Sequence, residues 1–151
     1  MRRGVPDMLE KKLDSVTSVR FSGTLLAFDF GLARIGAAVG NTVSGTAEPV
    51  EIFSGRTNEA KWSGVSRLIK EWLPNALVVG IPLHPDGAEQ EMTRRAERFA
   101  RQLEGRYGLS VYRVDERYSS VEVERGREKI DDQSAAVILQ QWLDENSARR
   151  P

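Results

Sequence analysis

The sequence contains no cysteine and one histidine, His84, among its 151 residues. The lack of cysteine excludes a disulfide framework, a zinc ribbon and a cysteine nucleophile. A single histidine excludes histidine-rich metal sites and argues against a serine–histidine triad. Any catalysis must therefore come from carboxylates, arginines, lysines or hydroxyl groups.

Long apolar runs and an excess of one charge are also absent. The most apolar stretch, Ala76–Leu83, is far shorter than the ~20 residues that span a bilayer. The first twenty residues lack the apolar centre of a signal peptide, so we predict a cytoplasmic protein without membrane contact. The 22 basic and 22 acidic residues balance, which weighs against a histone-like coat on nucleic acid but allows a local basic face.

The length suits one folded domain, which we assign to residues 23–146, followed by a tail over residues 147–151. Residues 1–22 are polar and mixed in charge, with some apolar residues at helical spacing. This arm is either disordered, the interpretation we favour, or a loosely docked helix.

Apolar runs bounded by Gly, Asn and Ser predict five strands, over Thr24–Phe30, Ile35–Val39, Thr46–Phe53, Ala76–Ile81 and Leu109–Val114. Apolar residues three and four apart predict helices over residues 62–72 and 92–103, the second ending at Gly108. A short helix is expected from Ser119 or Ser120, and a closing helix from Asp131–Asp132. We expect all three tryptophans, at positions 62, 72 and 142, to pack in the core.

This order of elements predicts an α/β protein with a five-stranded mixed sheet flanked by helices. Three hairpin-joined strands come first, and two β–α–β crossovers add parallel strands. The first, fourth and fifth strands can then run in the same direction. Their carboxyl ends meet at one edge, where open α/β sheets place ligands.

Acidic residues from three distant parts of the chain converge on that edge. Asp29 lies in the first strand, Asp115 and Glu116 follow the fifth, and Asp131 opens the closing helix. Carboxylate oxygens are preferred ligands of Mg²⁺, and two such ions about 3.5–4 Å apart can orient a water and stabilise a leaving oxygen. The pattern therefore predicts phosphodiester hydrolysis with Mg²⁺ or Mn²⁺ as the cofactor.

Only one of Asp115 and Glu116 is expected to face the metals, because successive strand residues point to opposite faces. The first and fifth strands, with one strand between them, lie roughly 9–10 Å apart. Carboxylate oxygens on either side of a metal pair would lie some ~8 Å apart. The length of Glu116 closes that difference, so we choose it over Asp115.

Each acid also has a structural interpretation. Asp131 is a good helix N-cap. Glu116 can form a surface ion pair with Arg117, and Asp29, which is costly to bury alone, can pair with Arg34.

Several residues are candidates for holding the phosphates of a substrate. Gly31 lets the backbone approach a ligand, and Arg34 can bind a phosphate through two hydrogen bonds. The helix over residues 92–103 carries Arg94 and Arg98 on its polar side, which is either a phosphate-binding track or an ordinary solvated face. Arg117, next to the last acidic pair, completes the set.

Four segments together resemble the YqgF (RuvX) family. Residues 28–36, FDFGLARIG, resemble its D-x-G-x-x-R-I-G motif, and VVGIPL at 78–83 with DGAEQ at 86–90 is similar to G-L-P-L…D-G-T-E-Q, with Ala88 in place of Thr. DERYSS at 115–120 resembles D-E-R-[LF]-[ST]-[ST], and KID at 129–131 with SAA at 134–136 resembles the last block. The match covers roughly residues 24–144 and leaves out the N-terminal arm.

The resemblance implies an RNase H-like fold related to Holliday-junction resolvases. It also implies a nuclease acting on the 5′ end of precursor 16S ribosomal RNA, with Asp29, Glu116 and Asp131 as catalytic, metal-binding acids. Two alternatives stay open: a Holliday junction resolvase acting on branched DNA, and a non-catalytic module that binds RNA, the ribosome or the transcription machinery. The protein is either a monomer or a homodimer, since a small domain that cuts both strands of a junction would have to dimerise.

Overall fold

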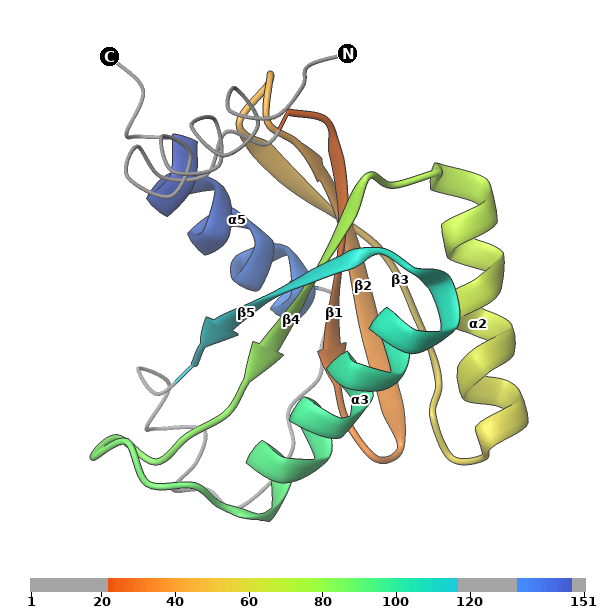
Figure 1. The fold of residues 1–151 in the computed structure, drawn as a ribbon, viewed down its shortest axis with the longest axis vertical. Helices are drawn as coiled ribbons and strands as arrows, with labels where there is room; N and C mark the ends of the chain where they lie inside the picture. Colours follow the sequence, from red (N-terminus) through yellow and green to blue (C-terminus); the bar gives the residue numbers. More distant parts are fainter. Residues whose placement is uncertain (1–21, 117–132, 148–151) are drawn as a thin grey trace, which may run out of the picture.

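A computed structural model of the chain describes residues 22–116 and 133–147. Five strands form one mixed sheet in the order β3-β2-β1-β4-β5 (Figure 1). Their bounds are β1 Thr24–Phe30, β2 Arg34–Asn41, β3 Thr46–Ser54, β4 Ala76–Ile81 and β5 Ser110–Asp115. The first three strands pair antiparallel, whereas β4 pairs parallel with both β1 and β5. The predicted mixed sheet is confirmed.

Helices cover both faces of this sheet (Figure 1). α2 (Asn58–Trp72) and α3 (Glu91–Tyr107) pack on one face, and α5 (Ser134–Ser147) packs on the other. The side chains of β1 alternate between the two cores. Leu26 and Phe28 face α2 and α3, while Leu25 and Ala27 face α5. The strand is therefore buried on both sides, as its apolar run predicts.

Local hydrogen bonds fix where the helices begin and end. The Thr57 hydroxyl accepts from the backbone N–H of Ala60 at 3.0 Å and caps α2. Helix α3 ends at Gly108, as predicted, in the left-handed conformation at φ 67°. At its start, the buried Thr93 hydroxyl donates to the carbonyl of Pro82 and so ties α3 to the loop after β4.

Some expectations need correction or lie outside the described residues. Trp72 is 38% exposed, because the last turn of α2 lies beside a solvent-open hollow of about 270 Å³ that is also lined by Thr24 and Asn41. The helix expected near Ser119, the arm over residues 1–21 and the first residues expected in the closing helix lie outside the described parts. Within 22–116 and 133–147, no helix has both the length and the hydrophobicity needed to cross a bilayer.

Candidate active site

The parallel strands β1, β4 and β5 bring their carboxyl ends to one edge of the sheet (Figure 1). Asp29 is the next-to-last residue of β1 and lies opposite Gly36 of β2. Its neighbours Phe28 and Phe30 pack with the α2 and α3 side of the sheet. Since side chains alternate along a strand, Asp29 faces the α5 side.

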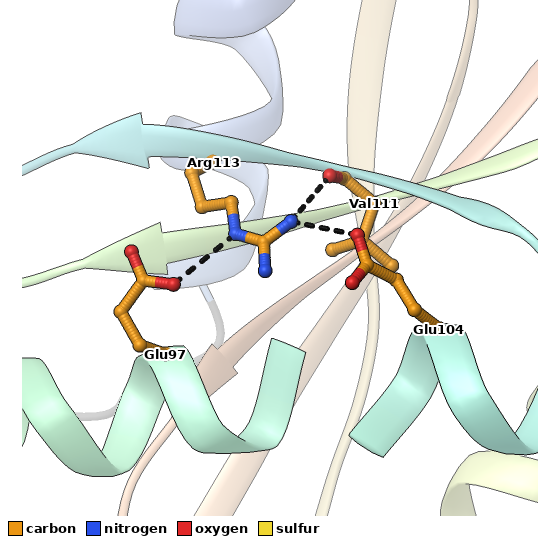
Figure 2. Close-up of polar contacts among 4 residues, drawn as sticks. All are labelled: Glu97, Glu104, Val111 and Arg113. Carbon is orange, nitrogen blue, oxygen red and sulfur yellow. Dashed lines mark hydrogen bonds and ion pairs between the residues drawn. The ribbon is translucent and has the colours of Figure 1, made fainter. Parts of the chain in front are cut away.

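An ion-pair cluster with α3 shows which face of β5 turns toward that helix (Figure 2). The Arg113 guanidinium donates to Glu104 at 2.8 Å, to Glu97 at 3.3 Å and to the Val111 carbonyl at 2.9 Å. Arg113 therefore points toward α3. By the same alternation, Asp115 faces the α3 side, where it is exposed.

Glu116 continues the pairing of β4 and β5 one residue beyond β5. Its backbone N–H donates to the carbonyl of Ile81 at 3.0 Å, which fixes the backbone at this position. Glu116 thus follows the face of Val114, which packs against α5. Glu116, and not Asp115, is therefore the acid on the face of Asp29.

The carboxylate of Glu116 lies over Gly80, a residue of the strand between β1 and β5. A Cβ atom added to Gly80 would lie 2.5 Å from Glu116 Oε2, 2.7 Å from its Cδ and 2.6 Å from Ile138 Cδ1. Such separations are far below an ordinary van der Waals contact, so only glycine leaves room for this side chain. The missing side chain in β4 allows Glu116 to lie across the strand that separates it from β1.

Burial, followed by the negative charges of Asp29 and then Asp115, raises the pKa of Glu116 to about 8 from its usual 4.5. Two carboxyl groups in one poorly solvated place resist ionising together. The pair formed by Asp29 and Glu116 in the metal-free protein therefore favours a state in which the two acids share one proton. A divalent cation bound between the two groups would relieve this repulsion and favour both ionised carboxylates.

The donor set fits Mg²⁺ or Mn²⁺, because hard divalent cations take carboxylate oxygens. Asp29 and Glu116 would supply ligands from two strands. The third predicted ligand, Asp131, lies outside the described residues. Among residues 22–116 and 133–147, the structure contains no group of three potential metal ligands.

The residues predicted to bind phosphates do not gather at one place in the structure. Arg34 opens β2 and is exposed, and within the described parts of the chain it forms no ion pair, so the alternative of an ion pair with Asp29 is not present in the structure. Gly31 is buried in the turn after β1 and has no positive φ.

Helix α3 carries Arg94 and Arg98, both exposed, over the face opposite Asp29 and Glu116. Arg94 lies 3.9 Å from Glu89. Arg117 lies outside the described residues.

Gly80 is the residue whose role the sequence reasoning missed. An isolated glycine among branched residues of a strand indicates a close approach by another group, and that signal was present in the run Val78–Ile81. What approaches the glycine depends on the pairing of β4 with β5.

The fold places the chain among RNase H-like α/β proteins, as predicted. It is similar to T. thermophilus RuvC solved with a Holliday junction substrate, with a TM-score of 0.50 and 14% identity over 82% of this chain and 94% of that one. It is also similar to Archaeoglobus fulgidus Pelota, with a TM-score of 0.52 and 14% identity over 98% of this chain and 40% of that one. At these identities the likeness concerns the fold alone.

The family described as "RuvX: Holliday junction resolvase" matches residues 23–145, and the chain belongs to it. A protein of Paraburkholderia xenovorans (strain LB400) is 52% identical over 128 residues, which cover 80% of this chain and 88% of the relative. A protein of Burkholderia mallei (strain SAVP1) is 53% identical with the same coverage. Both are named "Putative pre-16S rRNA nuclease". The predicted family is confirmed.

Proposed function

We propose that the protein is a divalent-metal-dependent nuclease that hydrolyses phosphodiester bonds near the 5′ end of precursor 16S rRNA. The proposal depends on the position of the Glu116 carboxylate. It lies over Gly80 and is close enough to Asp29 for the negative charge of Asp29 to raise the pKa of Glu116. The names of the relatives that match at 52–53% identity support the choice of substrate.

In this mechanism Asp29 and Glu116 would hold the metal together with Asp131. Mg²⁺ or Mn²⁺ bound there would supply positive charge to activate a water and to stabilise the leaving oxygen. Glu116 must release its proton to act as a ligand, and the adjacent Ile138 keeps its carboxylate poorly solvated. Gly80 keeps the path between the two acids open.

The test is cleavage of labelled precursor 16S rRNA by purified protein in Mg²⁺ and in Mn²⁺. We expect Asp29→Asn and Glu116→Gln each to lose about 10²–10³-fold in rate, the scale seen when one group that stabilises transition-state charge is removed. Asp115→Asn is the matched control, because it removes the neighbouring acid that faces α3. Cleavage by Asp29→Asn at the wild-type rate refutes the mechanism.

A four-way DNA junction is the second substrate to assay, because the family description names a Holliday junction resolvase. Cleavage of the junction in preference to the RNA would assign the same acids to resolution of branched DNA. Sedimentation with the junction would then show a dimer, since both strands must be cut. Binding of RNA, ribosomes or transcription proteins in EDTA, with no cleavage in either metal, would indicate the non-catalytic module.

A further inference from the structure

Three cations meet along the line where α2 packs against α3: Lys61, Arg98 and Arg106, here called the cationic seam. The three lie close enough for their charges to interact: burial first, and then the positive charges of Arg98 and Arg106, lower the pKa of Lys61. Within 22–116 and 133–147, none of the three forms an ion pair. Other arginines on these helices do, such as Arg67 with Glu51 at 2.6 Å.

Aromatic rings hold the seam in place. Lys61 Nζ lies 5.7 Å from the centroid of the Phe30 ring and 5.3 Å from that of Trp62, and Arg106 Cζ lies 3.9 Å from the centroid of Trp62. Phe99 stacks between Phe30 and Trp62, with centroid distances of 4.8 and 5.6 Å. Aromatic faces attract cations but carry no net charge, so these rings leave the positive charge of the seam in place.

Helix stability does not account for this arrangement. Arg106 lies in the last turn of α3, where a cation favours the helix dipole. Lys61, by contrast, is the fourth residue of α2, where the dipole disfavours a cation. It is also partly buried and repelled by two arginines. Helix formation alone therefore does not explain a lysine here, and a bound anion would offset the repulsion among the three cations.

The seam begins at the edge of the sheet that carries the acids. Phe30, which lies under the Lys61 ammonium, directly follows Asp29 in β1. Consecutive side chains of a strand point to opposite faces, so the acids and the seam lie on opposite faces near the end of β1. A nucleic-acid strand that passes over this edge can reach both.

We propose that the cationic seam binds the phosphodiester backbone of the nucleic acid that flanks the cleaved bond. The proposal rests on the proposed function for the identity of its ligand. Contacts with phosphates position a nucleic acid without reading its sequence, and each one neutralised adds to the salt dependence of binding. Of the helix arginines predicted from the sequence, only Arg98 belongs to this site.

The experiment measures binding in EDTA, so that cleavage plays no part. Two probes are compared over 50–300 mM KCl: a hairpin RNA from the 5′ region of precursor 16S rRNA and a four-way DNA junction. The test protein carries Lys61→Gln, Arg98→Gln and Arg106→Gln. The control carries Arg67→Gln, Lys70→Gln and Arg95→Gln, which remove the same charge from the same two helices.

The slope of log Kd against log salt should fall by about 2–3 in the test protein and by less than one in the control. An equal fall in slope for both probes supports a phosphate site shared by RNA and DNA. A fall for one probe alone identifies that nucleic acid as the ligand of the seam. Equal slopes for the test and control proteins overturn the proposal.

Single substitutions at Lys61 test its charge without the disturbance of three simultaneous changes. Lys61→Arg keeps the charge and should keep the wild-type slope, while Lys61→Gln alone should lower the slope by about one. Wild-type protein that binds through the seam but cleaves neither substrate would refute the proposed nuclease and leave the seam standing. Cleavage by the wild-type protein, together with an unchanged slope in the test protein, would refute the seam and leave the proposed nuclease standing.

Discussion

Replacing Gly80 by alanine tests whether the position of Glu116 matters. The new methyl carbon would lie 2.5 Å from Glu116 Oε2 and 2.6 Å from Ile138 Cδ1, so both atoms must move by about 1 Å to reach ordinary contact. Both are the far ends of flexible side chains, and the fold can accommodate the shift. A displacement of about 1 Å in a catalytic site can cost roughly 100-fold in rate, and we expect a loss of that size.

The assay compares kcat for precursor rRNA, the midpoint of thermal unfolding and the affinity for Mn²⁺. Gly80→Ala should lower kcat and Mn²⁺ affinity while the midpoint stays close to wild type. Gly105→Ala is the matched control: nothing lies within 4 Å of its Cβ position, and a helical alanine should add about 0.5–1 kcal/mol of stability. Wild-type kcat in Gly80→Ala would show that the place of Glu116 over β4 is irrelevant to catalysis.

Two further predictions concern stability. The raised pKa of Glu116 means that the folded state binds more protons than the unfolded state between about pH 4.5 and 8, so the stability of the metal-free protein should fall as pH rises through this window. Urea midpoints measured in EDTA should show that slope, and Glu116→Gln should remove it; an equal slope in both proteins contradicts the assignment. Arg113→Gln breaks two partly exposed ion pairs, each worth about 0.2–1 kcal/mol, so calorimetry should show a midpoint lower by about 2–4 °C for each kcal/mol lost. Arg67→Gln breaks only the exposed pair with Glu51 and should have a smaller effect.

The sheet and the separation of the two acids were predictable because both depend on local geometry. Alternation along a strand separates Asp115 from Glu116 whatever the rest of the chain does. Short hairpins and β–α–β crossovers restrict the strand order to a few arrangements. Alternation predicts that the two acids separate, and side-chain length favoured Glu116; which face each acid takes needed the structure, where Glu116 follows Val114 toward α5.

The role of Gly80 was not predictable, because it depends on contacts between distant segments. Gly80 pairs with Val114, and Ile138 of α5 packs over the same point. The same limit explains Trp72. Periodicity assigns it to the apolar face of its helix, yet periodicity does not indicate where that helix passes beyond its core.

The cationic seam was only partly visible for a similar reason. The sequence shows arginines along the helix over residues 92–103, and Arg98 is one of them. Lys61 comes from the other helix, and its neighbours are set by how α2 packs on α3. The charge pattern of one helix therefore does not distinguish an arginine that only faces solvent from one that lies beside a cation of another helix.

On each face of the sheet edge, groups of like charge repel one another, and this has a consequence for stability. The acids repel one another on the α5 side, and Lys61 is repelled by Arg98 and Arg106 on the other. A ligand that relieves either repulsion binds the folded state preferentially, so it stabilises by about 2.7 kcal/mol at one hundred times its Kd. For a domain of this size, that is a rise of roughly 5–10 °C in the unfolding midpoint.

Mn²⁺ and RNA should therefore each raise the midpoint by separate routes. The rise with Mn²⁺ should disappear in the Asp29→Asn, Glu116→Gln double variant and persist in the seam variant. The rise with hairpin RNA in EDTA should show the opposite pattern. If one variant abolishes both rises, the two faces act as a single site, and the division between metal binding and backbone binding is wrong.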